Sequence, residues 1–255
     1  MKQIIRKIIK STGYDLIKVE NLPKEGSHMR SVGNMIYLLE DLKFRGLKCN
    51  SIIDVGANKC DWSRIAKRIF PDASFVLIEP QIELKNELEL FCAQFKNSRY
   101  FLVGAGPENT KRILTLWDDL AGSSLLPKVH PELLENGKQR EIEIVTIDNL
   151  MIKEKIRFPE IIKLDIQGFE LEALKGAEST FGKTDVYILE TSLFTFDDIY
   201  DMPVFSDVIN FMLERDYIVY DFGGFMRRPY DGALGQCDIC FVKRDGFFRK
   251  SNRWS

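Results

Sequence analysis

Hydrophobic and polar positions beyond residue 50 alternate between short β-branched runs and helical repeats. The β-branched runs at 51–55, 74–79 and 99–104 predict strands. Between them, apolar residues recur at helical spacing and predict helices over about 58–70 and 82–95. Strands that alternate with helices of this length are typical of parallel βαβ units.

The C-terminal part of the chain returns to this pattern after a different middle part. It predicts strand, helix, strand, helix, strand and strand, at 160–166, 171–177, 185–191, 204–213, 216–222 and 237–243. We expect a long loop between the last two strands. No internal repeat or linker interrupts the chain, so we predict one domain over 46–255.

The middle part has period-two alternation instead. Residues 112–118 and 141–147 alternate apolar and polar positions and predict half-buried or edge strands. The segment between them is rich in Gly, Ser and Pro. Long ordered insertions of this kind are usually site loops, so residues 119–138 are expected to form a lid over cofactor and acceptor.

The first 45 residues are expected to form an N-terminal helical addition, with breaks at Gly13 and Gly26. Within residues 1–10, pairs of isoleucines at helical spacing alternate with basic residues. Such a basic amphipathic helix can rest on a membrane surface. Its shortness favours docking on its own protein.

Composition narrows the class of protein. The 255 residues carry 36 Lys and Arg against 38 Asp and Glu, a net charge of −2 that argues against a general nucleic-acid binder. No uncharged apolar run approaches the length of a membrane span, and the N-terminus lacks the apolar region of a signal peptide. Five scattered cysteines indicate a reducing compartment, so a cytoplasmic protein is expected. Two histidines exclude a three-histidine zinc site.

The first candidate site lies where the strand at 51–55 passes into a helix. Asp54, Gly56 and Asn58 occupy this junction. Gly56 permits a sharp turn and a close approach of a ligand to the backbone. Nucleotide-like ligands bind at such junctions in open α/β sheets. Asp54 alone fits a helix-capping or turn carboxylate equally well.

Glu79 ends the second predicted strand and can accept both hydroxyls of a ribose. A nicotinamide dinucleotide would need the G-x-G-x-x-G pattern, but Asn58 and Asp61 stand where the second and third glycines would be. Asp61 would also repel a pyrophosphate. The residues therefore favour a ligand with a ribose and no phosphate, which S-adenosylmethionine satisfies.

Asp165 and Glu190 end two further predicted strands. If these strands are neighbours, the two carboxyls meet at one pocket, where such a pair can raise one pKa and create a base. The pair can also bind Mg²⁺ through oxygen ligands. Two solvated strand-end acids, or pairing of Lys163 with Asp165, are the structural alternatives. His130, in the predicted lid, is a further candidate base.

The sequence resembles the FkbM-type methyltransferases over about 51–243. The resembling blocks are DVGAN at 54–58, IEP at 78–80, SSL at 123–125, TIDNL at 146–150, KLDIQGFELEALKGA at 163–177, ILE at 188–190 and QCDICFV at 236–242. The block at 163–177 is the most specific of them.

The resemblance implies a class I methyltransferase fold. This is a Rossmann-like α/β fold with a seven-stranded mixed sheet, helices on both faces, and an antiparallel last strand inserted beside the fifth. It implies O-methylation of a hydroxyl on a sugar or secondary metabolite, with S-adenosylmethionine as the methyl donor. The alternative is a catalytically inactive S-adenosylmethionine-binding partner or scaffold. The acceptor would be a small molecule or glycan, and homo-oligomerisation is left open.

The resemblance also implies roles for single residues. Asp54, Gly56 and Asn58 would hold the methionine end of the cofactor, and Glu79 would hold the ribose. The adenine amino group would contact the backbone near Gly104. The family usually has glycine at the position of Cys60, so we expect the larger side chain there to crowd the cofactor.

Overall fold

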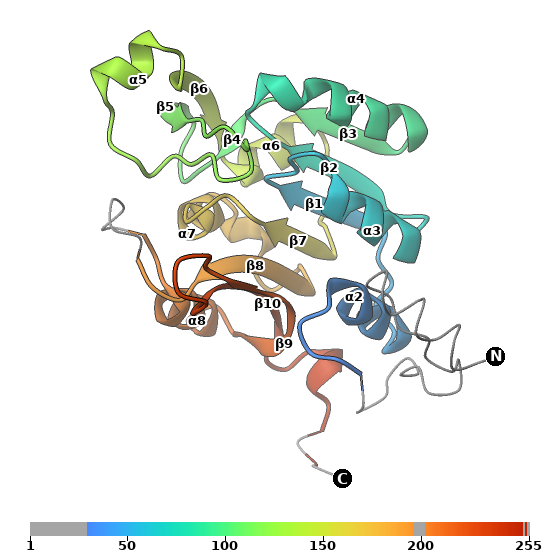
Figure 1. The fold of residues 1–255 in the computed structure, drawn as a ribbon. Helices are drawn as coiled ribbons and strands as arrows, with labels where there is room; N and C mark the ends of the chain where they lie inside the picture. Colours follow the sequence, from blue (N-terminus) through green and yellow to red (C-terminus); the bar gives the residue numbers. More distant parts are fainter. Residues whose placement is uncertain (1–29, 196–201, 252, 254–255) are drawn as a thin grey trace, which may run out of the picture.

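The computed structural model describes residues 30–195, 202–251 and 253, and its centre is a seven-stranded sheet (Figure 1). The strand order is β3-β2-β1-β7-β8-β10-β9. The strands are β1 Ser51–Val55, β2 Ser74–Ile78, β3 Ser98–Phe101, β7 Ile161–Leu164, β8 Val186–Ser192, β9 Tyr217–Arg227 and β10 Leu234–Lys243.

Strand β10 runs antiparallel to both of its neighbours, β8 and β9. The pairs that join β3, β2, β1, β7 and β8 are all parallel. The predicted mixed sheet, with its last strand inserted antiparallel beside the fifth, is therefore confirmed. Because the parallel strands point the same way, their carboxyl ends meet at one edge of the sheet.

Helices cover both faces of the sheet, as the alternating side chains of its strands require. Ile53 and Val55 of β1 face a core shared with α6, α7 and α8, whereas Ile52 faces a core shared with α2, α3 and α4. The helices are α2 Met35–Phe44, α3 Asp61–Ile69, α4 Lys85–Gln94, α6 Ile147–Lys153, α7 Glu170–Lys175 and α8 Phe205–Leu213.

The predicted long loop between the last two strands is wrong. Strand β9 continues to Arg227 and β10 begins at Leu234, so a short turn joins them. Gly223 and Gly224, which follow the predicted strand, both lie inside β9. A β-carbon at Gly223 would meet the side chain of Met35 in α2, and one at Gly224 would meet the carboxylate of Asp238. The two glycines allow close packing on a continuous strand.

The middle part of the chain forms a second, three-stranded sheet in the order β4-β6-β5. Its strands are β4 Gly104–Ala105, β5 Thr110–Thr115 and β6 Gln139–Val145, and a short helix α5, Pro131–Glu135, lies between β5 and β6. The prediction of a strand to residue 147 is wrong at its end. The Thr146 side chain accepts a hydrogen bond from the Asn149 N–H and begins α6 instead.

Helix α2 begins after the cap residue Asn34, whose side chain accepts a hydrogen bond from Tyr37 N–H. Leu38, Leu39 and Leu42 bury one side of α2 in the core of the main sheet. Residues 1–29, with the predicted basic helix and the breaks at Gly13 and Gly26, lie outside the described residues. The division at residue 45 stays a prediction.

No helix among the described residues is both long enough and apolar enough to cross a membrane.

Candidate functional site

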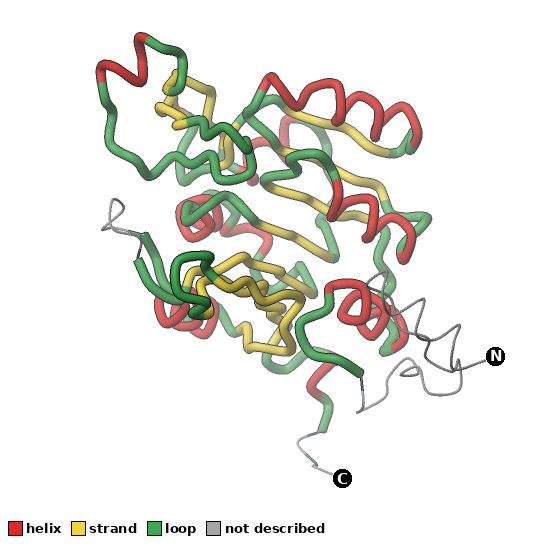
Figure 2. Tube along the Cα trace, viewed as in Figure 1, coloured by secondary structure: helices red, strands yellow, loops and turns green. Residues whose placement is uncertain are grey.

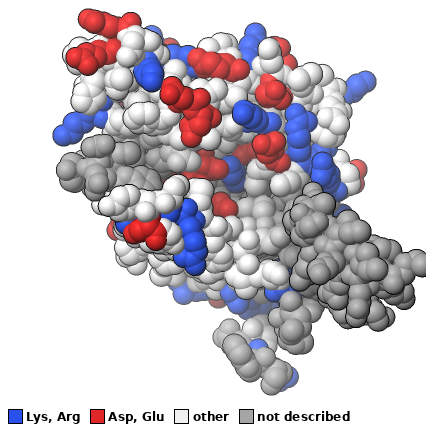
Figure 3. Space-filling model, in the orientation of Figure 1, with Lys and Arg blue, Asp and Glu red and all other residues white. Residues whose placement is uncertain are grey.

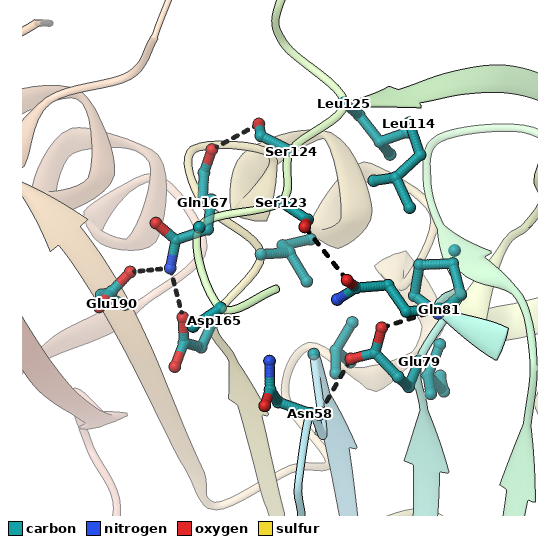
Figure 4. Close-up of a pocket in the computed structure, with 18 of the residues that line it drawn as sticks. Asn58, Glu79, Gln81, Leu114, Ser123, Ser124, Leu125, Asp165, Gln167 and Glu190 are labelled. Carbon is teal, nitrogen blue, oxygen red and sulfur yellow. Dashed lines mark hydrogen bonds between the residues drawn. The ribbon is translucent and has the colours of Figure 1, made fainter. Parts of the chain in front are cut away.

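A cavity of about 420 Å³ lies at the carboxyl ends of β1, β2, β7 and β8 (Figure 4). Gly56, directly after β1, forms part of its wall and has φ +78°. A β-carbon at this position would overlap the carbonyl oxygen of Asp165. The glycine is therefore required because the loops after β1 and β7 pack backbone against backbone.

Glu79 lies at the end of β2 with its side chain at the cavity and 2% exposed. Its two oxygens accept hydrogen bonds from the backbone N–H groups of Asn58, at 2.9 Å, and Gln81, at 3.0 Å. Burial raises the pKa of Glu79, and these two N–H groups oppose the rise. Each oxygen keeps a lone pair, so the anchored carboxylate can still accept hydroxyl groups. We call Asn58, Glu79 and Gln81 the binding half of the cavity.

Asn58 and Cys60 both have left-handed backbone conformations, with φ of +45° and +63°. Glycine adopts such a conformation without strain, which accounts physically for glycine at position 60 in the family. The Cys60 side chain is fully buried and contacts the carbonyl oxygens of Asn58 and Glu87, away from the cavity wall. The geometry gives no support to the expected crowding of the cofactor by Cys60, which stays a prediction.

Asp54 is buried beneath the loop after β1 and does not line the cavity. Ser63 of α3 donates a hydrogen bond of 2.6 Å to its Oδ2, and Lys163 Nζ lies 3.7 Å from its Oδ1. Burial raises the pKa of Asp54, although Lys163 and Ser63 oppose the rise. Asp54 therefore supports the loop from below, and its expected contact with the cofactor stays a prediction.

Asp165 directly follows β7, Glu190 lies near the end of the adjacent strand β8, and both line the cavity, as the sequence predicted. The side-chain amide of Gln167 joins them, donating to Asp165 Oδ1 at 3.0 Å and to Glu190 Oε2 at 2.8 Å. Gln236 of β10 donates a second hydrogen bond to Glu190 Oε2, at 3.1 Å. We call Asp165, Gln167, Glu190 and Gln236 the acidic half of the cavity. Figure 4 shows Asp165, Gln167 and Glu190 across the cavity from Glu79 and Gln81.

Lys163 gives the acidic half its nearest positive charge, and its ammonium lies 2.9 Å from Asp165 Oδ2. The predicted alternative, pairing of Lys163 with Asp165, is therefore present in addition to the carboxyl pair. Burial raises the pKa of Asp165, but the charge of Lys163 together with the hydrogen bonds from Lys163, Glu190 and Gln167 outweighs it, so the pKa is lowered. Burial and the charge of Asp165 raise the pKa of Glu190 to about 9. At neutral pH, Asp165 is an anion and Glu190 keeps its proton.

Gln167 has a left-handed backbone with φ +55°, which a nearby carboxylate helps to hold. Glu170, in the first turn of α7, accepts hydrogen bonds from the N–H groups of Ile166, at 2.8 Å, and Gly168, at 3.2 Å. Burial raises the pKa of Glu170 to about 7. The strained turn thus aims the amide of Gln167 at the two carboxyls.

The first part of the predicted lid crosses the cavity between its two halves. Figure 2 shows the lid as green loop with the short red helix α5 near its end. Gln81 donates a hydrogen bond to the carbonyl of Leu120 and accepts one from the Ser123 hydroxyl. The Ser124 hydroxyl donates to the carbonyl of Gln167 at 2.9 Å. Neighbouring serines therefore attach the lid to the binding half and to the acidic half.

A second, larger hollow of about 1060 Å³ adjoins the first and shares Ser124 and Gln167 with it. Trp117 and Tyr230, which are 46% and 90% exposed, line it. His130 also lines this second hollow and not the first cavity, and it precedes α5. His130 is therefore not brought together with Asp165 and Glu190. Gly104, by contrast, lines the first cavity, and its contact with the adenine stays a prediction.

Sequence reasoning missed the amide side chains of Gln81, Gln167 and Gln236 as site residues. Ser123 and Ser124 carried a signal, since they belong to a block of the family resemblance.

Among the described residues, no group of three or more His, Cys, Asp and Glu side chains is placed to hold a metal ion. The expectation of a bound Mg²⁺ therefore gains no support.

Acidic and basic side chains are mixed over the face drawn in Figure 3.

The family described as "Methyltransferase FkbM domain" matches residues 54–219, more than half of the chain. The chain belongs to this methyltransferase family. Its sheet order and antiparallel last strand are those of the class I methyltransferase fold that the sequence predicted.

Solved structures similar to this chain include a methyltransferase FkbM from Methylobacillus flagellatus KT, at 18% identity and a TM-score of 0.49. The match covers 75% of this chain and 43% of that protein, so the chain spans less than half of its length. The O-methyltransferase TomG from Streptomyces achromogenes, solved with SAM, has 12% identity and a TM-score of 0.47, with 82% and 79% covered. The comparison with curated proteins gave no match.

Proposed function

We propose that this FkbM-family protein transfers a methyl group from S-adenosylmethionine to a hydroxyl of a small-molecule or glycan acceptor. The observation that carries the proposal is the division of one cavity into a binding half and an acidic half. The first suits a ribose and the second suits removal of a proton. The free state of all five cysteines fits a cytoplasmic site of action.

The residues of the binding half fit the donor. Glu79 offers two anchored carboxylate oxygens to the ribose hydroxyls, and a buried carboxylate of this kind binds neutral hydroxyls strongly. Gly104, Leu114 and Leu125 line the cavity with small or apolar groups, which suits a flat adenine ring. When bound, the cofactor supplies a methyl group on a positively charged sulfur.

The second hollow suits the acceptor. It meets the cavity at Gln167, whose amide contacts both carboxyls of the acidic half. The exposed rings of Trp117 and Tyr230 offer flat apolar faces, and Thr115, Ser192 and Thr195 offer hydroxyls along the wall. An acceptor placed there would present its hydroxyl to Glu190 and Asp165, and positioning of this kind supplies much of the catalysis of methyl transfer.

Removal of the hydroxyl proton is the chemical task of the acidic half. An alcohol needs a base as its oxygen forms the bond to the methyl carbon. Glu190 lines the cavity, and its Oε2 accepts hydrogen bonds from Gln167 and Gln236 that stabilise the ionised form. Glu190 is the proposed proton acceptor, with Asp165 as the neighbouring anion that Lys163 holds in place.

The alternative is a partner protein that binds the cofactor without methyl transfer. Two observations count against it: the chain has a strained turn at Gln167, and it has a carboxyl of raised pKa at the cavity. The experiment uses S-adenosylmethionine with a labelled methyl group and a panel of sugars, phenols and aliphatic alcohols, with amines and thiols as controls. Transfer to oxygen supports the proposal. Tight binding without transfer to any acceptor supports the partner protein, and transfer to nitrogen or sulfur alone contradicts O-methylation.

A further inference from the structure

Glu190 sits in a part of the protein with more carboxylates than cations. Asp165 of β7 contributes to the rise of its pKa, and so do Glu170 of α7 and Asp238 of β10, the residue opposite Glu190 in the β8–β10 register. Lys163 is the nearby cation, and it already lies within 4 Å of both Asp54 and Asp165. The positive charge available to Glu190 is therefore already shared between two other carboxylates.

The immediate contacts of Glu190 suit both of its charge states. Gln167 and Gln236 donate to the same oxygen, Oε2, so an anion formed there has two hydrogen-bond donors in place. Burial and the neighbouring carboxylates oppose the anion while the cavity holds no positive charge. The geometry therefore makes the protonation state of Glu190 sensitive to one added charge in the cavity.

We propose that binding of the sulfonium cofactor releases the proton of Glu190, so that the base for the acceptor hydroxyl forms only when the methyl donor is in place. The proposal rests on the proposed function, because it takes S-adenosylmethionine as the ligand of this cavity. Glu190 lines the cavity, whereas Asp238 and Glu170 do not. Glu79 lines it too, but backbone N–H groups already bind both of its oxygens, so Glu190 is the group that responds. An empty site then holds a neutral acid, which cannot take a proton from the acceptor.

The charges balance through the reaction. Before transfer, the sulfonium carries one positive charge and Glu190 one negative charge. The oxygen–methyl bond forms, the sulfur–methyl bond breaks with its electron pair left on sulfur, and the hydroxyl proton passes to the carboxylate of Glu190. Afterwards the ether, the thioether S-adenosylhomocysteine and the acid are all neutral. The product therefore leaves Glu190 protonated, and binding of the next cofactor releases that proton.

Two consequences distinguish donor from product. Below pH 9, over the range in which binding releases one proton from Glu190, the affinity for S-adenosylmethionine should rise about tenfold per pH unit. The affinity for S-adenosylhomocysteine should lack this rise, since the thioether carries no charge to replace the proton. At alkaline pH the site therefore prefers its donor over its product.

The test is calorimetric titration of the full chain with each of the two ligands, at about pH 7.5, in buffers of different ionisation enthalpy. The dependence of the observed heat on that enthalpy gives the number of protons released. We expect S-adenosylmethionine to release about one proton more than S-adenosylhomocysteine. The α-amino group of both ligands can also exchange a proton, so a variant must isolate the share of Glu190.

Glu190→Gln imitates the protonated carboxyl in shape and charge, so it should fold, and thermal unfolding checks this. The variant should bind both ligands and lose the extra proton. Asp238→Asn is the matched control: it removes a half-buried carboxyl opposite Glu190 in the β8–β10 register and should keep the extra proton release. Equal proton release for the two ligands in the wild type, or an unchanged difference in Glu190→Gln, overturns the inference and leaves the proposed function standing. Absence of S-adenosylmethionine binding by the wild type overturns both.

Discussion

Glu79 and Glu190 both follow or end a parallel strand at the same cavity, but they differ in what surrounds them. Glu79 accepts two backbone N–H groups, which stabilise a carboxylate whose task is to hold neutral hydroxyls. Glu190 is surrounded by other carboxyls, and its pKa is raised to about 9. The comparison teaches that one edge of a sheet can hold a binding carboxylate and a chemically active one, set apart by their neighbours.

The largest expected effect comes from variants of the acidic half alone. Glu190→Gln and Asp165→Asn should each lower methyl transfer by roughly 10²–10⁴-fold, the usual contribution of a positioned base, and should still bind the cofactor. Initial rates with labelled cofactor measure this once an acceptor is found. Glu172→Gln on the exposed side of α7 is the control and should keep the wild-type rate. If the double variant transferred methyl groups near the wild-type rate, Asp165 and Glu190 would have a structural role and not a catalytic one.

The second effect concerns the backbone contact between the two halves. Gly56→Ala should destabilise the protein by roughly 1–3 kcal/mol more than Gly182→Ala, because only the former overpacks, against the Asp165 carbonyl. Gly182 has nearly the same φ, +77°, and open space around it, so its variant carries the backbone strain alone. Denaturant unfolding of both variants measures the difference. Equal losses would mean that the contact between the loops after β1 and β7 is unimportant.

The third effect is the pH dependence of stability that Glu190 gives to the acidic half. Glu190 has a pKa raised to about 9, against an ordinary value of 4.5. Its contribution to stability is full below the ordinary pKa and is lost as pH rises toward 9. Glu190→Gln stays neutral, so its free energy of unfolding should gain on the wild type as pH rises from about 5 to 9. Denaturant unfolding across this range measures the gain.

Glu83→Gln is the control, because the pKa of Glu83 is shifted in the opposite direction from that of Glu190. The hydrogen bonds from Arg140 lower the pKa of Glu83, so its contribution is lost only in acid. Its difference from the wild type should be constant between about pH 5 and 9. A constant difference for Glu190→Gln as well would contradict the raised pKa.

The smallest effect concerns the lid that joins the halves. Ser123 and Ser124 attach residues 119–138 to Gln81 and Gln167, so a bound cofactor beneath them should slow protease cutting there several-fold. Limited proteolysis with and without S-adenosylmethionine measures the rates. Equal cutting rates would count against a lid.

The sequence allowed the edge of the cavity to be predicted because parallel strands end together. Glu79, Asp165 and Glu190 each follow or end a strand that apolar patterning identified, and the structure brings all three to one cavity. Asp54 differs because side chains alternate along β1. It shares with Ile52 the face covered by α3, where Ser63 binds it.

Contacts between distant segments could not be predicted in this way. Gln167 contacts Glu190 23 positions away, and Gln236 contacts it from 46 positions away. No sequence pattern indicates which distant residue an amide side chain will contact. Only the antiparallel insertion of β10 places Gln236 beside β8. The second hollow depends in the same way on how the lid, the loop after β8 and the β9–β10 turn meet.

The measurement that tests the central claim most directly is calorimetric titration with S-adenosylmethionine of the wild type, Glu79→Ala and Glu190→Gln. Wild-type protein should bind at one site, and Glu79→Ala should bind more weakly by about 1.5–3 kcal/mol, because two hydroxyls lose a charged acceptor. Glu87→Ala on the exposed face of α4 serves as the control and should bind like the wild type. Glu190→Gln should still bind at the same site. Unchanged affinity in Glu79→Ala, or no binding by the wild type, would contradict the division of the cavity into a binding half and an acidic half.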